Sequence, residues 1–167
     1  RTAAVEVSET IRARFRGSWN GIYRDIAVEG RRQDGSRWRI FVEVQGVTDG
    51  EGRELRYETS REGDHRRVKI WVPGARDATR SIVLRYRVEN ALLFHETEEE
   101  FQGEDFDELF WNVTGTGWPF PIESASATFH LPEGATGTRA RAWTGAFGST
   151  AQDATVEVLG PMVEVST

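Results

Sequence analysis

Apolar and polar residues alternate along most of this chain with a period of two. The alternation is clearest in residues 36–44, 68–72 and 82–88, where apolar side chains hold one parity and charged side chains hold the other. Successive side chains of a β-strand point to opposite faces, so this pattern predicts strands with one buried face. Trp38 and Ile40 share the apolar parity of the first segment, and we expect both to face the core. Shorter runs of the same kind occur at 11–16, 125–131, 156–158 and 163–165.

Turn-forming pairs separate these runs at short intervals. Asp34-Gly35, Asp49-Gly50 and Pro73-Gly74 are the clearest, and no window shows a convincing helical stripe of apolar residues. About nine to ten short strands are therefore predicted, in an all-β antiparallel β-sandwich, with a barrel as the second architecture. Neither an internal repeat nor a linker is found, so residues 1–167 are expected to form a single domain.

Composition excludes several classes of site. Hydrophobic residues make up 38% and charged residues 29%, which is typical of a globular domain. The net charge is −6 and no basic block stands out, so a nucleic-acid partner is not expected. The absence of cysteine excludes disulfides, thiolate metal sites and cysteine nucleophiles, and no cofactor is expected. The longest apolar runs are far too short to span a membrane.

The segment 110–132 concentrates aromatic residues, glycines and prolines. Trp111 falls on a core-facing parity, and Gly115 and Gly117 are expected to adopt positive φ angles in a sharp turn. Pro119 and Pro121 lack N–H donors on the same side of an extended chain, which excludes a central strand there. We therefore expect a sheet edge or a corner between two sheets, with pairing resumed over 122–131.

Two motifs together carry a family resemblance. They are GIYRDI at 21–26 and LFWNVTG at 109–115, the second followed by Trp118, Pro121 and Ile122. Over residues 5–158 the chain resembles a bacterial family of predicted membrane proteins, domain of unknown function 2207. The resemblance implies an extracytoplasmic β-rich domain of a membrane-anchored protein, whose anchoring segments lie outside this chain. It also implies structural roles for the motif residues Gly21, Asp25, Trp111, Gly115, Gly117 and Pro121.

These motifs and the residues beside them supply candidates for an exposed binding edge: Trp19, Tyr23, Arg24, Asn112 and Trp118. For the two tryptophans the alternative is packing beneath each other's loops. Arg24 and Asp25 are adjacent on a strand and therefore point to opposite faces, so each needs its own partner. A buried structural pin is the favoured interpretation of Arg24, with ligand recognition as the alternative, and Asp25 is expected to cap backbone N–H groups of a turn.

An acidic run between residues 96 and 108 offers candidate ligands for a metal ion. Carboxylates at Glu104, Asp105, Asp107 and Glu108 could hold Ca²⁺, although a solvated acidic loop is the favoured interpretation and no metal site is predicted. The three histidines, at 65, 95 and 130, have no metal-binding spacing, and His130 is expected to be exposed.

These features favour a non-catalytic domain on the extracytoplasmic face of the cell membrane, one that mediates interactions with a protein or a cell-envelope component. The alternative is a carbohydrate-binding module that uses Trp71, Trp118 or Trp143, or an envelope-acting glycosidase that uses Asp105 and Asp107. Trp71 shares its face with Arg67 and Lys69, and exposed indoles beside polar groups suit either kind of binding.

Overall fold

The computed structural model describes residues 4–32, 35–95, 105–146 and 148–167. The chain divides into two compact units, Arg1–Trp111 and Asn112–Thr167. The all-β antiparallel prediction is confirmed, because every paired strand in the described part is antiparallel and no helix occurs there. The described strands are β1 (Ala4–Arg14), β2 (Gly21–Ala27), β3 (Glu29–Arg31), β4 (Arg37–Arg39), β5 (Phe41–Asp49), β6 (Tyr57–Glu62), β7 (His65–Trp71), β8 (Thr79–Glu89), β9 (Leu92–His95), β10 (Phe106–Leu109), β11 (Ser126–His130), β12 (Thr155–Leu159) and β13 (Met162–Ser166).

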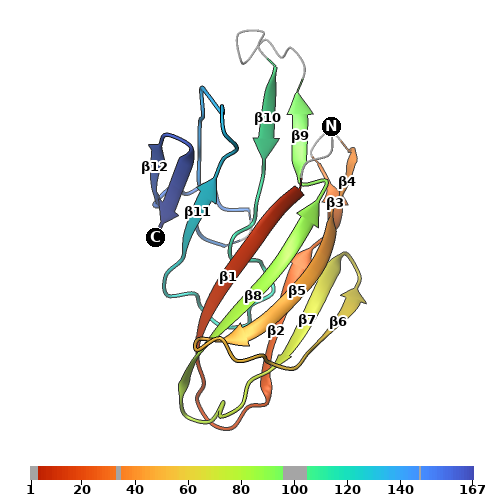
Figure 1. Ribbon diagram of the computed structural model, residues 1–167, viewed down its shortest axis with the longest axis vertical. Helices are drawn as coiled ribbons and strands as arrows, with labels where there is room; N and C mark the ends of the chain where they lie inside the picture. Colours follow the sequence, from red (N-terminus) through yellow and green to blue (C-terminus); the bar gives the residue numbers. More distant parts are fainter. Residues whose placement is uncertain (1–3, 33–34, 96–104, 147) are drawn as a thin grey trace. The chain divides into compact units, whose positions relative to one another are not determined.

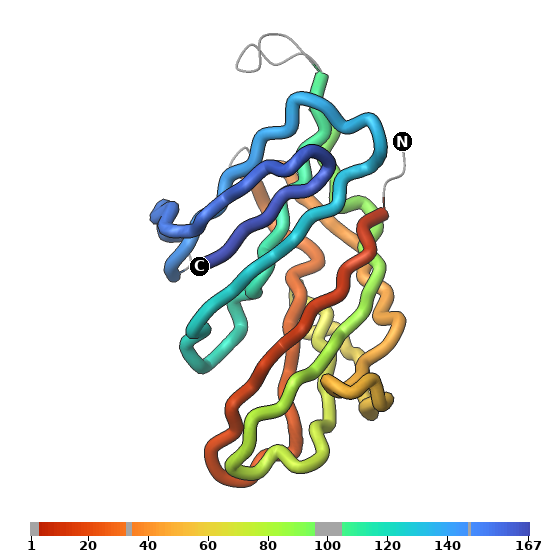
Figure 2. Tube along the Cα trace, turned by 60° about the vertical axis from the view of Figure 1, so that its left-hand side comes forward, coloured from red at the N-terminus to blue at the C-terminus, as the bar shows by residue number. Residues whose placement is uncertain are grey.

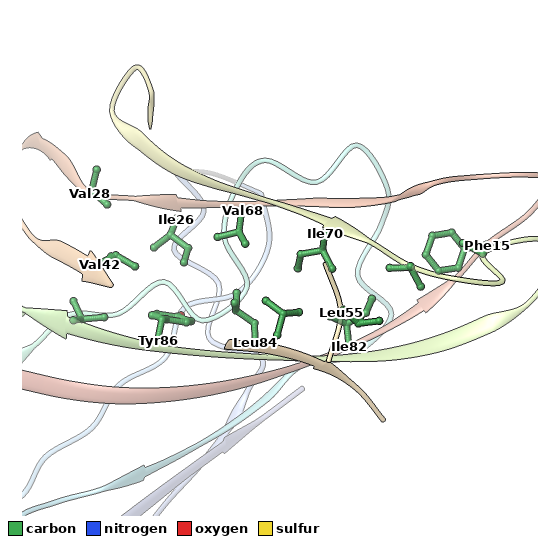
Figure 3. Packing of buried hydrophobic residues seen from close by; sticks show 14 residues of the cluster. Phe15, Ile26, Val28, Val42, Leu55, Val68, Ile70, Ile82, Leu84 and Tyr86 are labelled. Carbon is green, nitrogen blue, oxygen red and sulfur yellow. The ribbon is translucent and has the colours of Figure 1, made fainter. Parts of the chain in front are cut away.

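The first unit contains two three-stranded sheets, in the orders β1-β8-β5 and β2-β7-β6, as Figure 1 shows. Two ribbons, β3-β4 and β9-β10, extend it. The hydrophobic core lies between the two sheets (Figure 3). Val68 and Ile70 of β7 face Leu84 and Tyr86 of β8 across this core, and all four are at most 1% exposed. The expected alternation thus produces a small sandwich with one buried face per sheet.

One strand boundary differs from the prediction because a backbone N–H bonds to a residue outside the neighbouring strand. The run 36–44 was expected to form one strand, but it divides at Ile40, whose N–H donates to the carbonyl of Val28 at 2.9 Å. Ile40 still packs against the core, whereas Trp38 does not. The indole of Trp38 instead covers Gly30 across the β3-β4 ribbon, where a Cβ at position 30 would lie 2.7 Å from Nε1. A core position for Trp38 was therefore wrong, because the alternation does not continue across the interruption between β4 and β5.

Strand β5 contains a β-bulge. Its register against β8 shifts between Val44 and Gly46, so Gln45 has no partner of its own on β8. Val42 and Val47 are both buried although they differ in parity, because the extra residue reverses the alternation. The bulge keeps an apolar face toward the core at both ends of the strand.

The second unit is a three-stranded sheet in the order β11-β13-β12, in which Val163 of the central strand is buried. Figure 2 shows the β12-β13 hairpin with β11 along the other side of β13. No strand occurs between β10 and β11, which agrees with the exclusion of a central strand by the prolines, but pairing resumes at Ser126 rather than at Ile122. Gly115 has the expected positive φ of 77°, whereas Gly117 does not adopt a positive φ.

Candidate binding surface

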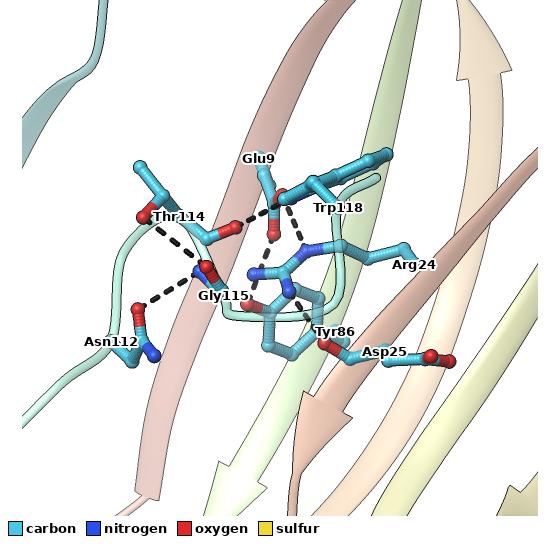
Figure 4. A network of polar contacts seen from close by, with 8 residues as sticks. All are labelled: Glu9, Arg24, Asp25, Tyr86, Asn112, Thr114, Gly115 and Trp118. Atoms are coloured by element: carbon cyan, nitrogen blue, oxygen red, sulfur yellow. Dashed lines mark hydrogen bonds and ion pairs between the residues drawn. The ribbon is translucent and has the colours of Figure 1, made fainter. Parts of the chain in front are cut away.

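Arg24 forms the centre of a buried polar network in the first unit (Figure 4). The register of β2 places it beside Val68 on the core face, and it is 2% exposed. Its Nε donates to Oε1 of Glu9 at 2.7 Å, and its Nη1 donates to the carbonyl oxygen of Asp25 at 2.6 Å. Because Glu9 lies on β1 and Arg24 on β2, the pair joins the two sheets. Arg24 therefore acts as a structural pin and is not displayed at the surface.

Tyr86 completes this network from β8. Its hydroxyl donates to Oε2 of Glu9 at 3.4 Å, and its ring lies 6.3 Å from the ring of Trp111. Burial, followed by the negative charge of Glu9, raises the pKa of Tyr86 above the ordinary value of 10.0. The neutral phenol is thus favoured, as a donor to a carboxylate requires. Trp111 packs against the core, as predicted.

Asp25 occupies the opposite face of β2. It accepts two hydrogen bonds from Arg67 of β7, with Nε to Oδ1 and Nη2 to Oδ2 both at 2.8 Å. These bonds hold the pKa of Asp25 below its usual value of 3.8. The expected capping of a turn by Asp25 was wrong, because the cross-strand register brings a guanidinium directly opposite the carboxylate.

The outward face of β2-β7-β6 gathers aromatic and cationic side chains. Residues directly opposite in an antiparallel ladder share a face, and Tyr23 lies opposite Lys69 and Gly21 opposite Trp71. The guanidinium of Arg56 lies 4.1 Å from the centroid of the Trp71 ring, and Nζ of Lys69 lies 4.5 Å from it. On the neighbouring row, Arg67 lies 5.0 Å from the ring of Tyr23, which is 53% exposed. We call this surface the aromatic–cation face: Tyr23, Arg56, Arg67, Lys69 and Trp71.

The alternation of residues in the sequence was enough to identify only the part of this face that lies on β7. Trp71, Lys69 and Arg67 share one strand, so their common orientation could be read from spacing. Tyr23 and Arg56 come from other parts of the chain, and only the strand register brings them to the same surface.

Gly21 is required by the close approach of β2 to β7. An added Cβ at this position would lie 1.8 Å from the carbonyl oxygen of Ile70, and the φ of Gly21 is 157°. No side chain fits between the strands there. The structural role implied for Gly21 thus has a direct steric cause.

Trp19 lies in the connection between β1 and β2 rather than on a sheet. Its side chain is 50% exposed, and its Nε1 donates to the carbonyl oxygen of Arg16 at 2.7 Å. The backbone N–H of Trp19 donates to the carbonyl of Ala75 at 2.9 Å. These bonds fix an exposed indole at the end of the first unit.

Asn112 and Trp118 both stabilise a turn in the second unit (Figure 4). Oδ1 of Asn112 accepts from the backbone N–H of Gly115 at 2.9 Å, and Nε1 of Trp118 donates to the carbonyl oxygen of Thr114 at 2.7 Å. Trp118 is half-buried, and Gly117 and Pro121 are exposed in the same segment. Of the five residues predicted to form an exposed edge, three lie in the first unit and two in the second. Only Tyr23 belongs to the aromatic–cation face.

The candidate calcium ligands are not assembled into a metal site in the described part of the chain. Glu104 lies outside the described residues, Asp105 and Asp107 are exposed, and Oε2 of Glu108 lies 2.9 Å from Nε2 of His95. The described residues contain no group of three or more histidines and carboxylates suited to a metal ion. His130 is exposed, as expected.

Comparison with known proteins identifies the family of the chain. No curated protein and no solved structure matches it. No helix within the described ranges is both long enough and apolar enough to cross a membrane. A family model described as the N-terminal domain of a predicted membrane protein, domain of unknown function 2207, matches residues 2–161. This description supports membrane association, and the chain belongs to that family.

Proposed function

We propose that this chain is the extracytoplasmic domain of a membrane-anchored protein and that it binds a protein or another cell-envelope component without catalysing a reaction. The family description, which is that of a predicted membrane protein, supports the membrane association of the parent protein. The aromatic–cation face is the observation that carries the binding role.

Two properties of this face suit a protein partner. Tyrosine, tryptophan and arginine are the residues most enriched at the energetic centres of protein interfaces. Here they are held in place before any partner arrives, because Asp25 fixes Arg67 at 2.8 Å and the cations lie against the rings. Side chains already fixed lose little conformational entropy on binding.

A carbohydrate-binding module is the second candidate, since Trp143 of the second unit is 51% exposed. The other two tryptophans that it would use are already engaged. The Trp71 ring contacts two cations, and the indole N–H of Trp118 is bonded within its own turn. A sugar would have to stack on Trp143 or displace these contacts.

Binding of the purified domain to detergent-solubilised envelope proteins and to envelope glycans, measured in parallel, tests the proposal. We expect Tyr23→Ser and Lys69→Glu to abolish protein binding. Phe110→Ser removes an aromatic side chain that is 67% exposed but lies outside the face, so it should leave binding unchanged. Wild-type binding by both face variants would refute the role of the face, and glycan binding lost only in Trp143→Ser would favour the second candidate.

The proposed side of the membrane needs a separate experiment. In spheroplasts that contain the full-length protein, protease added outside should cleave within residues 1–167. Cleavage seen only after lysis would place the domain on the cytoplasmic side.

A further inference from the structure

The outer edge of β5 has a gap in its backbone pairing. At one end Ile40 N–H bonds to Val28, and at the other the carbonyl of Val47 accepts from Leu55 N–H at 2.9 Å. Alternate residues of a strand direct their N–H and C=O groups to the same side, so Val42 and Val44 also point away from β8. No described residue bonds to the backbone of Val42 or Val44 on that side. The strand edge is therefore open between two closed ends.

Two clefts of about 200 and 400 Å³ lie along this gap, between the edges of β5 and β6. They share two lining residues, Val42 and Arg66. The larger cleft also has Val44 and Tyr57 in its wall, which makes part of its lining apolar. The arrangement offers backbone hydrogen bonds, apolar contacts and one cation to a single ligand.

Arg66 has no anionic partner within the described residues. The parity of β7 turns it toward the interior, in register with Ile26 and Arg61, and it is half-buried. The described part of the chain contributes neither an ion pair nor a side-chain hydrogen bond to it. A half-buried guanidinium without a carboxylate has lost part of its hydration without compensation.

The neighbouring arginines differ from Arg66 in this respect. Glu29 accepts from Arg39 at 2.9 Å and from Arg61 at 2.7 Å, so both of these cations are paired. Glu43 lines the larger cleft but forms no ion pair with Arg66. The positive charge of Arg66 thus remains directed into the clefts.

We propose that this side of the first unit binds an extended peptide segment that carries a carboxylate side chain. The peptide backbone pairs with Val42 and Val44 as an added strand, and its carboxylate accepts hydrogen bonds from Arg66. A free small anion would satisfy Arg66 alone and leave the strand edge open, so both features together favour a peptide. This site shares no residue with the aromatic–cation face, and its test is independent of the proposed function.

The direct experiment is a titration with two labelled peptides, Thr-Val-Thr-Glu-Thr-Val-Thr and the same peptide with glutamine in place of glutamate, followed by fluorescence anisotropy. A charge-assisted hydrogen bond should make the glutamate peptide bind roughly tenfold more tightly. Arg66→Gln should remove this difference. Arg85→Gln, at an exposed arginine on the outward face of β8, should retain it. Equal affinity of the two peptides for the wild-type protein, or an unchanged preference in Arg66→Gln, would overturn the proposal.

Strand addition has its own readout in amide hydrogen exchange. The glutamate peptide should slow exchange at Val42 and Val44, and Val44→Pro, which removes one outward N–H, should weaken both peptides. The wild-type exchange data decide the matter even if the proline variant does not fold. Protection of these amides in the absence of peptide, together with dimer formation, would assign the edge to a second copy of the chain. Competition by inorganic phosphate without protection of these amides would indicate a small-anion site, and either result would overturn the peptide proposal.

Discussion

Arg24 of β2 reaches Glu9 of β1 through the interior of the first unit, with 2.7 Å between Nε and Oε1. Each of these strands is an edge of its own three-stranded sheet. The ion pair therefore links the two sheets at the side where neither β1 nor β2 pairs with another described strand of the unit. Arg24 is 2% exposed and Glu9 is 16% exposed, so solvent screens the pair only weakly.

Replacement of Arg24 by methionine should strongly destabilise the domain. The change leaves the Glu9 carboxylate without its cation in a largely desolvated site, and breaking a buried pair in this way costs about 3 kcal/mol or more. Chemical denaturation monitored by tryptophan fluorescence would measure this change in the free energy of unfolding.

The double variant Glu9→Leu/Arg24→Met is the matched test, because it removes both charges. We expect it to recover most of the stability lost in the single variant. Arg53→Ala breaks an exposed pair with Asp49, in which Arg53 is 71% exposed, and should leave stability almost unchanged. Equal losses in Arg24→Met and Arg53→Ala would contradict the assignment of a buried pin.

Gly21→Ala should destabilise the first unit through a steric clash between strands. The new Cβ would overlap the Ile70 carbonyl oxygen, so the start of β2 must separate from β7, at a cost of about 2 kcal/mol or more. Thermal unfolding would measure the effect. Gly46→Ala is the control, since a Cβ there meets nothing within 4 Å, and a similar loss in both variants would exclude the clash as its cause.

The ion pair between Asp25 and Arg67 should contribute to stability in a way that depends on acidic pH. The pKa of Asp25 is lowered in the folded protein, so the folded state binds fewer protons than the unfolded state below the ordinary value of 3.8. The contribution is complete above this value and is lost as the pH falls through the depressed pKa. In Arg67→Gln, the free energy of unfolding should therefore fall less between pH 5 and pH 2 than in the wild type. If the free energy of unfolding of the variant and of the wild type fell equally over this pH range, the ion pair would not be the source of the acid sensitivity.

The burial of Tyr86 should make the free energy of unfolding fall as the pH rises in the alkaline range. Its pKa is raised above 10.0 by burial, so the unfolded chain ionises first. Stability from Tyr86 is complete below pH 10 and is lost as the pH rises toward the folded pKa. Ultraviolet difference titration should show one tyrosine that ionises only with unfolding, and Tyr86→Phe should remove that step. Ionisation of all three tyrosines in the folded protein would refute this placement.

Asn112 should stabilise the second unit through its acceptor oxygen. Asn112→Ala removes the bond to the Gly115 N–H and should cost about 1 kcal/mol, whereas Asn112→Asp keeps an acceptor and should cost less. Exchange of the Gly115 amide would report the loss locally. An unchanged exchange rate in the alanine variant would show that this bond does not hold the turn.

Parity in the sequence was sufficient to predict the buried face of β8, although it misplaced Trp38. The even residues of β8 from Ile82 to Val88 are fully buried, and the prolines correctly excluded a central strand before β11. Both conclusions depend only on local spacing and on the missing N–H of proline, which sequence displays directly.

Cross-strand partners could not be predicted in the same way. The partner of Asp25 is 42 residues away and that of Arg24 is 15 residues away in the other sheet, and both depend on register. Arg66 is different, because its parity with Val68 and Ile70 already pointed inward. That signal was present in the sequence, but an arginine at the start of a strand is easily assigned to solvent.

The bulge at Gln45 has a consequence for how the length of this chain can vary. Loss of Glu43, for example, would place Val44 opposite Arg87 and turn its side chain from the interior to water. Loss of Gln45 itself would restore an unbroken alternation, with Val42, Val44 and Val47 still on the interior side. The bulge is therefore a place where a one-residue deletion in the strand leaves the sandwich interior intact.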